Sequence, residues 1–492
     1  MTTIYAGPVI NPQSLTSYLA LPRCLIAVDS NGNILWIDPD VDNTNLPLAI
    51  AHHGVQAYTL VQLKPGEFIM PGLVDTHIHA CQFPNLGVGG DLQLLDWLTT
   101  YTFPAESKFK DLDYAERVYT DVVERVIASG TTTCCYYGSI HRDATMRLAD
   151  IVRKKGQRAF VGKCNMNWHC PDYYVEKSVE ESISATVDLI RYVQSFPLSP
   201  AQEPLVHPVI TPRFAISCTP DLLAELGDLA ESMPQIAIQT HISENQKEVD
   251  DTLRFFNADS YAGIYDKFKL LRHNTILAHG VWLTEKEMDL IAERGAGLSH
   301  CPTSNFYLNS GMARVGLLLD HGVKVGLGSD VSGGYNPSIL HAIQMASVAS
   351  KMLAIQSESK KCNCEREHEH SDISSDSAEV EQHLKHKEGR FANKRLGVAT
   401  LLYLATKGGA EVCCLQDRIG SFEPGKAFDA LLVSVRSESG NPAMWSFDLE
   451  REPSPESKLQ QWLERFLFCG DNRNINKVIV QGTVIGGQEY QA

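Results

Sequence analysis

The amino-acid sequence predicts an α/β fold: a TIM-like (β/α)8 barrel with a small β-sandwich-like domain formed by both ends of the chain. Three observations support this prediction. Apolar strand candidates alternate with longer amphipathic stretches through the middle of the chain, and short extended segments gather near both ends. The length of 492 residues is sufficient for a barrel and a smaller attachment.

Eight strands are expected in the middle of the chain, each followed by a stretch with helical periodicity. They fall near residues 69–79, 131–137, 158–165, 205–216, 236–244, 275–281, 296–302 and 323–330. Strands that alternate with helices form parallel sheets, and eight such units close most naturally into a barrel.

The small β domain is expected to be discontinuous in sequence. Residues 1–68 contain extended candidates such as 25–28 and 33–37, separated by turn-forming residues. Further strand candidates lie at 428–433 and 476–480. We therefore assign residues 1–68 and 405–492 to the small domain, and residues 69–404 to the barrel.

Residues 357–393 interrupt the barrel pattern with a segment rich in Glu, Lys, His, Ser and Asp. Its Cys362, Cys364, His368 and His370 offer atoms that metals bind. A disordered, solvated insertion is the stronger expectation, because the segment has too little apolar surface to offset the entropy of ordering.

Composition restricts the partners and the compartment that we expect. A formal net charge of -16 opposes phosphate backbones and anionic lipids, so neither a nucleic-acid polymer nor a membrane is expected as a partner. The 13 cysteines are odd in number and scattered, which is typical of reduced thiols. Residues 1–11 lack the basic start and apolar core of a signal peptide, and no run of 18 apolar, uncharged residues occurs. We expect a cytoplasmic protein.

The first predicted barrel strand ends in two histidines, His77 and His79. Successive side chains of a strand point to opposite faces, so these two project the same way and can bind one ion. The pattern His-x-His also arises by chance from ordinary imidazoles, so the prediction of a metal site needs further ligands.

Further candidate ligands close other predicted strands: His241 the fifth, His279 the sixth and Asp330 the eighth. Taken singly, each has a structural explanation, such as a helix-capping aspartate. The active-site groups of a (β/α)8 barrel lie at the C-terminal ends of its strands, so together they predict one mononuclear metal site. Imidazoles and a carboxylate without thiolates suit zinc or a similar divalent ion with an open position for water.

Glu244 follows His241 by three residues, where the strand turns into its loop. It is either a solvated loop acid or a group beside the metal-activated water. In the second case it can take a proton from that water and return it to a leaving amine. Asp330 can act both as a ligand and as a second proton acceptor, and His279 can orient the water instead of binding the metal.

Six longer stretches surround these residues. They are PGLVDTHIHACQ (71–82), LDWLTTYTFPAE (95–106), TPRFAI (211–216), QTHISENQKE (239–248), the segment 279–308 with SHCPTSNFYL, and GSDVSG (328–333). Over nearly its whole length the chain resembles the amidohydrolase superfamily, and within it the guanine deaminase family.

The resemblance implies one Zn²⁺ per chain, with His77, His79, His241 and Asp330 as its ligands. It implies that Glu244 and Asp330 shuttle protons and that His279 lies beside the attacking water. The one departure in these motifs is Cys81, where we expect proline, and it puts the rigidity of that loop in doubt rather than metal binding.

The reaction implied by the resemblance is hydrolytic loss of the exocyclic amine at C2 of guanine, giving xanthine and ammonia. Gln82, Arg213 and Phe214 would contact the base, with Arg213 donating to the purine carbonyl oxygen. The other residues implied in substrate contacts are His79, His241, Glu244 and Asp330. A homodimer is also implied, and dimers are the commonest soluble assembly.

Three alternatives remain open. A binuclear hydrolase of cyclic amides would need a carboxylated lysine or a glutamate to bridge two metals, and Lys163 is the candidate. Another mononuclear deaminase or chlorohydrolase-like enzyme would act on a different aromatic ring. A non-enzymatic scaffold would keep the fold alone. The cytidine type of zinc deaminase is set aside, because its Pro-Cys-x-x-Cys signature is absent.

Overall fold

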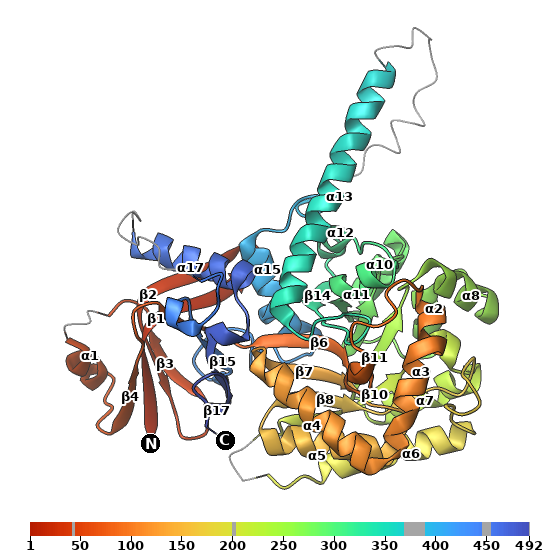
Figure 1. The fold of residues 1–492 in the computed structure, drawn as a ribbon, viewed down its shortest axis with the longest axis horizontal. Coiled ribbons are helices and arrows are strands. Elements are labelled where there is room, and N and C mark those ends of the chain that lie inside the picture. Colours follow the sequence, from red (N-terminus) through yellow and green to blue (C-terminus); the bar gives the residue numbers. More distant parts are fainter. Residues whose placement is uncertain (42–44, 199–202, 369–388, 445–453, 492) are drawn as a thin grey trace.

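The computed structural model describes residues 1–41, 45–198, 203–368, 389–444 and 454–491. Two parts lie side by side: a barrel ringed by helices, and a smaller β domain that holds both ends of the chain (Figure 1). Within these described ranges, no helix has the length and apolar character needed to cross a membrane.

The predicted eight-stranded parallel barrel is confirmed. Its strands follow one another around the barrel in chain order, and each consecutive pair is parallel: β6 (Leu73–His79), β7 (Thr131–Tyr137), β8 (Arg158–Gly162), β10 (Val206–Pro212), β11 (Ala237–Ile242), β12 (Thr275–His279), β13 (Gly297–His300) and β14 (Lys324–Leu327). A short strand, β9 (Cys164–Asn165), pairs beside β10. Beyond β14, the Asp330 amide donates to the His77 carbonyl (2.9 Å) and the His79 amide to the Val331 carbonyl (3.0 Å), which ties the last strand to the first.

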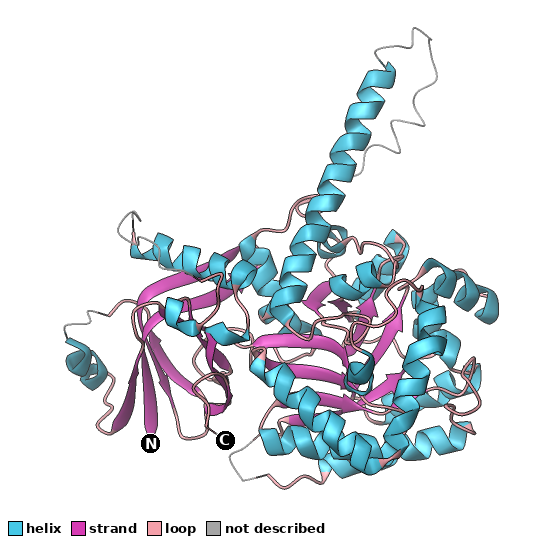
Figure 2. Cartoon of the chain, in the orientation of Figure 1, coloured by secondary structure: helices cyan, strands magenta, loops and turns pink. Residues whose placement is uncertain are grey.

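Helices cover the outside of the barrel (Figure 2). They are α4 (Leu112–Ala128), α5 (Arg142–Lys155), α6 (Val179–Gln194), α7 (Pro220–Ser232), α8 (Gln246–Phe256), α9 (Tyr261–Lys267), α10 (Glu285–Arg294), α11 (Pro302–Tyr307) and α12 (Val315–Asp320). Their ends follow local chemistry: Ser178 caps α6 through the Glu181 amide, and Thr284 forms a capping box with Glu287 at α10.

The expected single strand at 69–79 is wrong, because the structure has two strands there. β5 (Glu67–Pro71) pairs with strands of the small domain, and only β6 belongs to the barrel. Gly72 separates them, and a Cβ at this position would lie 2.1 Å from Thr132 Oγ1. The chain therefore enters the barrel after residue 72, a few residues later than the expected boundary.

The prediction that both chain ends build one β domain is confirmed. Its sheet has the order β17 (Thr483–Gly486), β16 (Ile475–Val480), β15 (Ala430–Ser434), β5, β1 (Thr2–Ser14), β2 (Ser17–Val28) and β3 (Ile34–Asp38), and β4 (Tyr58–Gln62) also pairs with β1. The core includes Tyr5 and Ile26 from the N-terminal part and Phe428 from the C-terminal part. Two helices accompany the sheet: α1 (Leu46–His52), whose Leu46 packs on Leu25, and α17 (Pro455–Cys469), which lies against β1 and β2.

Two further helices, α15 (Val398–Ala405) and α16 (Lys407–Val412), lie against the barrel. Ala410 and Val412 of α16 pack with Val74 near the start of β6, so α16 covers the end of the barrel where its strands begin. Gly409 permits this approach, since a Cβ there would lie 2.7 Å from the Cβ of Val74. This contact was not expected, because residues after 404 were assigned to the small domain.

The long helix α13 (Ile339–His368) projects away from both parts of the molecule (Figure 1). The helix extends through residues 357–368, the first part of the segment expected to be a disordered insertion. This part of the sequence contains the helix formers Glu, Lys and Arg. It continues a helix whose first turns are anchored by the buried side chains of Ile339 and Ile343. Residues 369–388 of the predicted insertion, including His370, lie outside the described residues.

Candidate active site at the C-terminal end of the barrel

Five predicted site residues converge where the barrel strands end. His77 and His79 come from β6, His241 from β11 and His279 from β12, and Asp330 lies three residues after β14. All are 8% or less exposed. The ligand atoms of His77, His241, His279 and Asp330 all lie within 4.8 Å of one another.

His79 adds a fifth donor to this cluster. Its Nε2 lies 3.0 Å from His241 Nε2 and 3.6 Å from Asp330 Oδ1, while His77 Nε2 lies 3.1 Å from the same carboxylate oxygen. The four residues whose ligand atoms are all close together thus include His279, which was expected beside the water. They do not include His79, which was expected among the ligands. The structure places both histidines within reach of the same carboxylate.

The donor set fits a bound cation. His241 Nδ1 donates to the Arg213 carbonyl, which leaves the lone pair of Nε2 directed at His79. Neither ring nitrogen of the buried His77 has a hydrogen-bond partner among the described residues. Burial, followed by neighbouring positive groups, holds the pKa of His77, His79 and His241 well below its ordinary value. Neutral imidazoles with free lone pairs are what a divalent metal binds.

Two acidic groups flank His279. Its Nε2 lies 3.3 Å from Glu244 Oε2 and 3.7 Å from Asp330 Oδ2, and its Nδ1 donates to Asn305 Oδ1 at 3.0 Å. Burial raises the pKa of both carboxyl groups, and the nearby Asp330 raises that of Glu244 further. Glu244 is therefore suited to carry a proton near neutral pH, as a general acid and base must.

The backbone at two of these positions is in the left-handed region, with φ of 78° at His279 and 46° at Asp330. Residues other than glycine adopt it rarely, and such conformations cluster at active sites, where the surrounding structure holds them. At Asp330 the backbone is held by the hydrogen bond from its amide to the His77 carbonyl. The closure of the barrel therefore also turns this carboxylate toward the histidines.

One pocket next to the cluster is lined by all seven residues expected to contact substrate: His79, Gln82, Arg213, Phe214, His241, Glu244 and Asp330. Leu94, Trp97, Leu98 and Leu308 supply an apolar wall. The pocket encloses about 380 Å³, near the lower end of the roughly 300–1,000 Å³ typical of small-molecule sites. It is suited to a small planar molecule with a few polar groups.

Apart from Leu308, the wall is built by the long connection between β6 and α4. It consists of η2 (Ala80–Asn85), α2 (Leu94–Trp97), η3 (Leu98–Thr102), α3 (Phe103–Glu106) and η4 (Ser107–Lys110). Trp97 and Phe103 from this connection pack in one cluster with Phe214 and Tyr174. Apolar packing therefore carries the connection across the end of the barrel.

Glu106, for which no role was expected, is completely buried in this connection. Its carboxylate accepts hydrogen bonds from both terminal nitrogens of Arg213 and from Gln82 Nε2. Burial alone would lower the pKa of Arg213, but the adjacent Glu106 outweighs it and keeps the pKa well above its ordinary value. The available signal was an acid within the LDWLTTYTFPAE motif, yet nothing in the motif indicates its partners.

Two other buried acids were also missed. Asp75 accepts from the amides of His77 (3.2 Å) and Ser329 (3.0 Å), and so joins β6 to the segment after β14. Burial raises its pKa to about 7. Glu248 accepts from the Glu244 amide at 3.1 Å, and burial raises its pKa to about 8. Asp75 therefore holds the backbone of His77, a member of the donor cluster, and Glu248 holds that of Glu244, which lines the pocket.

Lys163, the candidate bridging lysine of a binuclear site, does not belong to the cluster. Its Nζ pairs with Glu176 and donates to the Cys164 carbonyl at 2.9 Å. Glu176 in turn accepts from the Met166 amide (2.9 Å) and the Ser182 hydroxyl (2.6 Å). The lysine is thus engaged in a buried structural ion pair, and the structure offers no support for the binuclear alternative.

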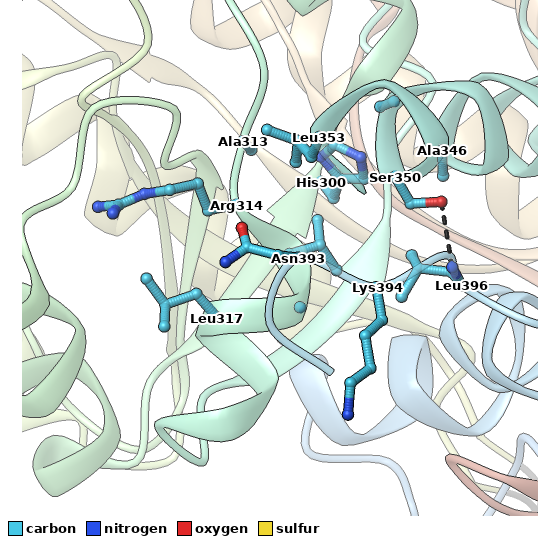
Figure 3. A pocket seen from close by; sticks show the side chains of 13 residues that line it. His300, Ala313, Arg314, Leu317, Ala346, Ser350, Leu353, Asn393, Lys394 and Leu396 are labelled. Carbon is cyan, nitrogen blue, oxygen red and sulfur yellow. Dashed lines mark hydrogen bonds between the residues drawn. The ribbon is translucent and has the colours of Figure 1, made fainter. Parts of the chain in front are cut away.

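A different pocket lies behind the barrel wall, between β13, α13 and the segment at 393–396 (Figure 3). His300, from the SHCPTSNFYL motif, lines it together with Arg314 and Asn393, and the Ser350 hydroxyl accepts from the Leu396 amide at 3.1 Å. His300 therefore lines a pocket other than the one with the predicted site residues.

Comparisons with known proteins agree with this geometry. Residues 68–485 match the model of the amidohydrolase family. The chain is 42% identical over 491 residues to a probable guanine deaminase of Schizosaccharomyces pombe, covering 99% of this chain and 84% of the relative. It is 40% identical over 482 residues to the guanine deaminase of Homo sapiens, covering 97% and 95%.

Among solved structures, the chain is similar to the crystal structure of guanine deaminase from C. acetobutylicum with bound guanine in the active site. The TM-score is 0.79 at 30% sequence identity, and the match covers 99% of this chain and 100% of the other. The similarity therefore extends over both the barrel and the small β domain.

Proposed function

The chain belongs to the amidohydrolase family, and from that premise we propose that it catalyses the hydrolytic deamination of guanine to xanthine and ammonia. The observation that carries the proposal is the single pocket in which a metal-type donor cluster, the acids Glu244 and Asp330, and the base-binding candidates Arg213 and Phe214 meet. Relatives with 38–42% identity over nearly the whole chain are guanine deaminases, and a similar structure holds guanine.

We propose that His77, His79, His241 and Asp330 hold one zinc ion per chain. Three imidazoles and one carboxylate without thiolates suit zinc, and His279 lies close enough to assist. When bound, the metal supplies Lewis acidity that lowers the pKa of an adjacent water toward neutrality.

The protein's own groups then move the protons. Glu244 takes one proton from the attacking water and passes it to the ring nitrogen beside C2, while His279, 3.3 Å from Glu244, orients the water. Asp330 takes the second proton and delivers it to the departing amine. The new C2–oxygen bond replaces the C2–nitrogen bond, so guanine and water give xanthine and ammonia without a covalent enzyme intermediate.

Substrate orientation falls to three side chains of the pocket. Arg213 donates to the purine carbonyl oxygen, Gln82 contacts the base edge and Phe214 packs on the ring. Phe214 and Arg213 directly follow β10, so the end of one strand supplies both the planar contact and the charged contact.

The decisive test substitutes Glu244→Gln and follows conversion of guanine to xanthine by absorbance. We expect turnover to fall by about 100-fold or more with the metal content retained, because the variant removes a proton carrier but no ligand. Glu287→Gln is a matched control, since Glu287 is another buried acid that caps helices outside the pocket. Equal turnover in Glu244→Gln would remove Glu244 from this role.

A second candidate function is deamination of another aromatic base, or a chlorohydrolase-like reaction, in the same pocket. A panel of guanine, adenine, cytosine, 8-oxoguanine and a chlorinated triazine separates these reactions, and we expect guanine to give the highest kcat/KM. Absence of ammonia or chloride release from every compound would favour a scaffold without activity.

We also propose that the protein acts in the cytoplasm as a homodimer. The cysteines that the structure describes are all free thiols, which suits a reducing compartment. Val348, Met352 and Ile355 recur at helical spacing on α13 and are 43% to 50% exposed, so they offer an apolar stripe for a second copy. Sedimentation of the full chain tests the assembly, and a monomer at micromolar concentration would contradict it.

A further inference from the structure

We propose that Glu106 is a positioning residue that makes the pocket prefer a 6-oxo purine to a 6-amino purine, by fixing the donors of Arg213 and Gln82. This inference rests on the proposed function, since it concerns how the same pocket recognises the group at C6 of the purine. Glu106 does not line the pocket, so it acts through the two residues that do.

The hydrogen-bond geometry around Glu106 fixes both partners. Oε2 accepts from Arg213 Nη1 at 2.8 Å, and Oε1 accepts from Arg213 Nη2 at 3.0 Å and from Gln82 Nε2 at 2.8 Å. Glu106 is 0% exposed and the other two are 2% exposed, so water does not compete for these bonds. Bidentate, charge-assisted bonds of this kind are strong and directional.

Each partner is also held from a second side. The Arg213 guanidinium lies over the Phe103 ring, with Cζ 5.1 Å from its centroid. The Ser332 amide donates to Gln82 Oε1 at 3.1 Å, which together with the bond from Nε2 to Glu106 determines which way the amide faces. Neither side chain can turn without losing one of these buried hydrogen bonds.

The chemistry of the fixed groups determines which bases fit. A guanidinium has only donors, so the N–H groups of Arg213 that Glu106 does not use can bind a carbonyl oxygen but not an amino group. An amino group at the same place would set donor against donor and leave buried groups unpaired, which is the strongest way for a site to reject an analogue. Without Glu106, Arg213 could move away from that amino group and the rejection would weaken.

Glu106 also balances charge. Arg213 lies near His77, His79 and His241, which would already share a metal cation, and its charge lowers their pKa. Because the Glu106 carboxylate offsets the charge of Arg213, the pair carries no net charge. Arg213 can then still donate hydrogen bonds to an uncharged base. The variant Glu106→Gln keeps the shape and one acceptor oxygen but removes both the charge and the second acceptor.

The test compares guanine with 2,6-diaminopurine, which carries the same amine at C2 and an amino group in place of the oxygen at C6. The readout is the ratio of the two kcat/KM values, measured for the wild-type holoenzyme, Glu106→Gln and Glu106→Asp. The ratio does not depend on the fraction of protein that is folded or metal-loaded, so a partly unfolded variant still gives a valid result.

For Glu106→Gln we expect the guanine preference to fall by about tenfold or more. The KM for guanine should rise more than kcat falls, and metal content should be unchanged. Glu106→Asp keeps the charge on a shorter side chain and should retain part of the preference. Asp429→Asn is the matched control: it breaks another buried arginine–carboxylate pair, far from the pocket, and should leave the ratio unchanged.

A double variant tests whether Glu106 acts through Arg213. In an Arg213→Gln background, the further change Glu106→Gln should alter the ratio by less than about twofold, because its route is already lost. A wild-type enzyme that makes no xanthine from guanine overturns the proposed function and this inference with it. An active wild type whose ratio is unchanged by Glu106→Gln, or falls equally in Asp429→Asn, overturns this inference alone.

Discussion

One buried ion pair joins the barrel to the small β domain, and its removal should cost stability without changing catalysis. Arg158, at the start of β8, donates to Asp429 through Nε (2.9 Å) and Nη2 (3.3 Å), and the two side chains are 1% and 2% exposed. Asp429 Oδ1 also accepts from the Gln481 amide at 2.7 Å. The pair lies where the barrel strands begin, at the end opposite the metal cluster.

The expected magnitude follows from this burial. Asp429→Asn leaves the Arg158 guanidinium as an uncompensated charge in a dry interface, and breaking one side of a buried pair costs about 3–5 kcal/mol. For 492 residues the entropy of unfolding is about 1 kcal/mol/K, so the melting temperature should fall by about 3–5 °C if both parts unfold together. Replacing both partners, as in Arg158→Met with Asp429→Leu, removes the stranded charge and should recover at least half of the loss.

Differential scanning calorimetry of the metal-loaded protein measures these shifts, and steady-state kinetics with guanine measures kcat per bound metal. We expect kcat to stay within about twofold of the wild type in both variants, because the pair touches no pocket residue. A loss below about 1 kcal/mol in Asp429→Asn would refute the reasoning from burial. So would a double variant that recovers less than half of that loss.

Two further predictions concern the metal and pH. Removing the metal with a chelator should abolish turnover and lower the melting temperature, and adding zinc should restore both. If the free metal had stood at roughly 1,000 times its Kd, the melting temperature should fall by about 4 °C. Turnover that survives complete removal of the metal would contradict the metal role. Burial lowers the pKa of His207 to about 4, below its unfolded value of about 6.5, so the unfolded state binds the proton first and stability falls as the pH drops from 6.5 to 4. Comparing wild type with His207→Gln by urea unfolding at pH 7 and pH 4.5 should show a smaller loss in the variant by about 2–3 kcal/mol, and equal losses would show that His207 does not titrate in this way.

Strand positions in the barrel could be predicted because each strand carries its own local signal. The segment at 131–137 matches β7 at both ends, since its run of β-branched and aromatic residues and cysteines lies entirely within the strand. The segment at 205–216 was predicted too long, because β10 ends at Pro212, which has no amide hydrogen to extend the ladder. Arg213 and Phe214 then leave the sheet and turn into the pocket.

The missing parts of the site depend on contacts between distant residues. Glu106 and Arg213 are 107 positions apart, and no property of either segment indicates that they form a pair. Asp75 alternates with His77 and His79 along the same predicted strand, but its partner Ser329 is 254 positions away. Buried charges of this kind become recognisable only when the fold shows which opposite charge or amide compensates for the loss of water.

Barrel closure and assembly of the candidate site are the same structural event. Two backbone hydrogen bonds join β6 to the segment after β14. Their donors are the amides of Asp330 and His79, which are themselves members of the donor cluster. Asp75 adds a third link across this seam through the Ser329 amide. A cation shared by His77 and Asp330 would therefore connect the first and last strands of the barrel directly. Metal binding should thus oppose opening of the barrel as a whole, so slowed hydrogen exchange on loading should extend along β6 and β14 rather than stay confined to the pocket loops.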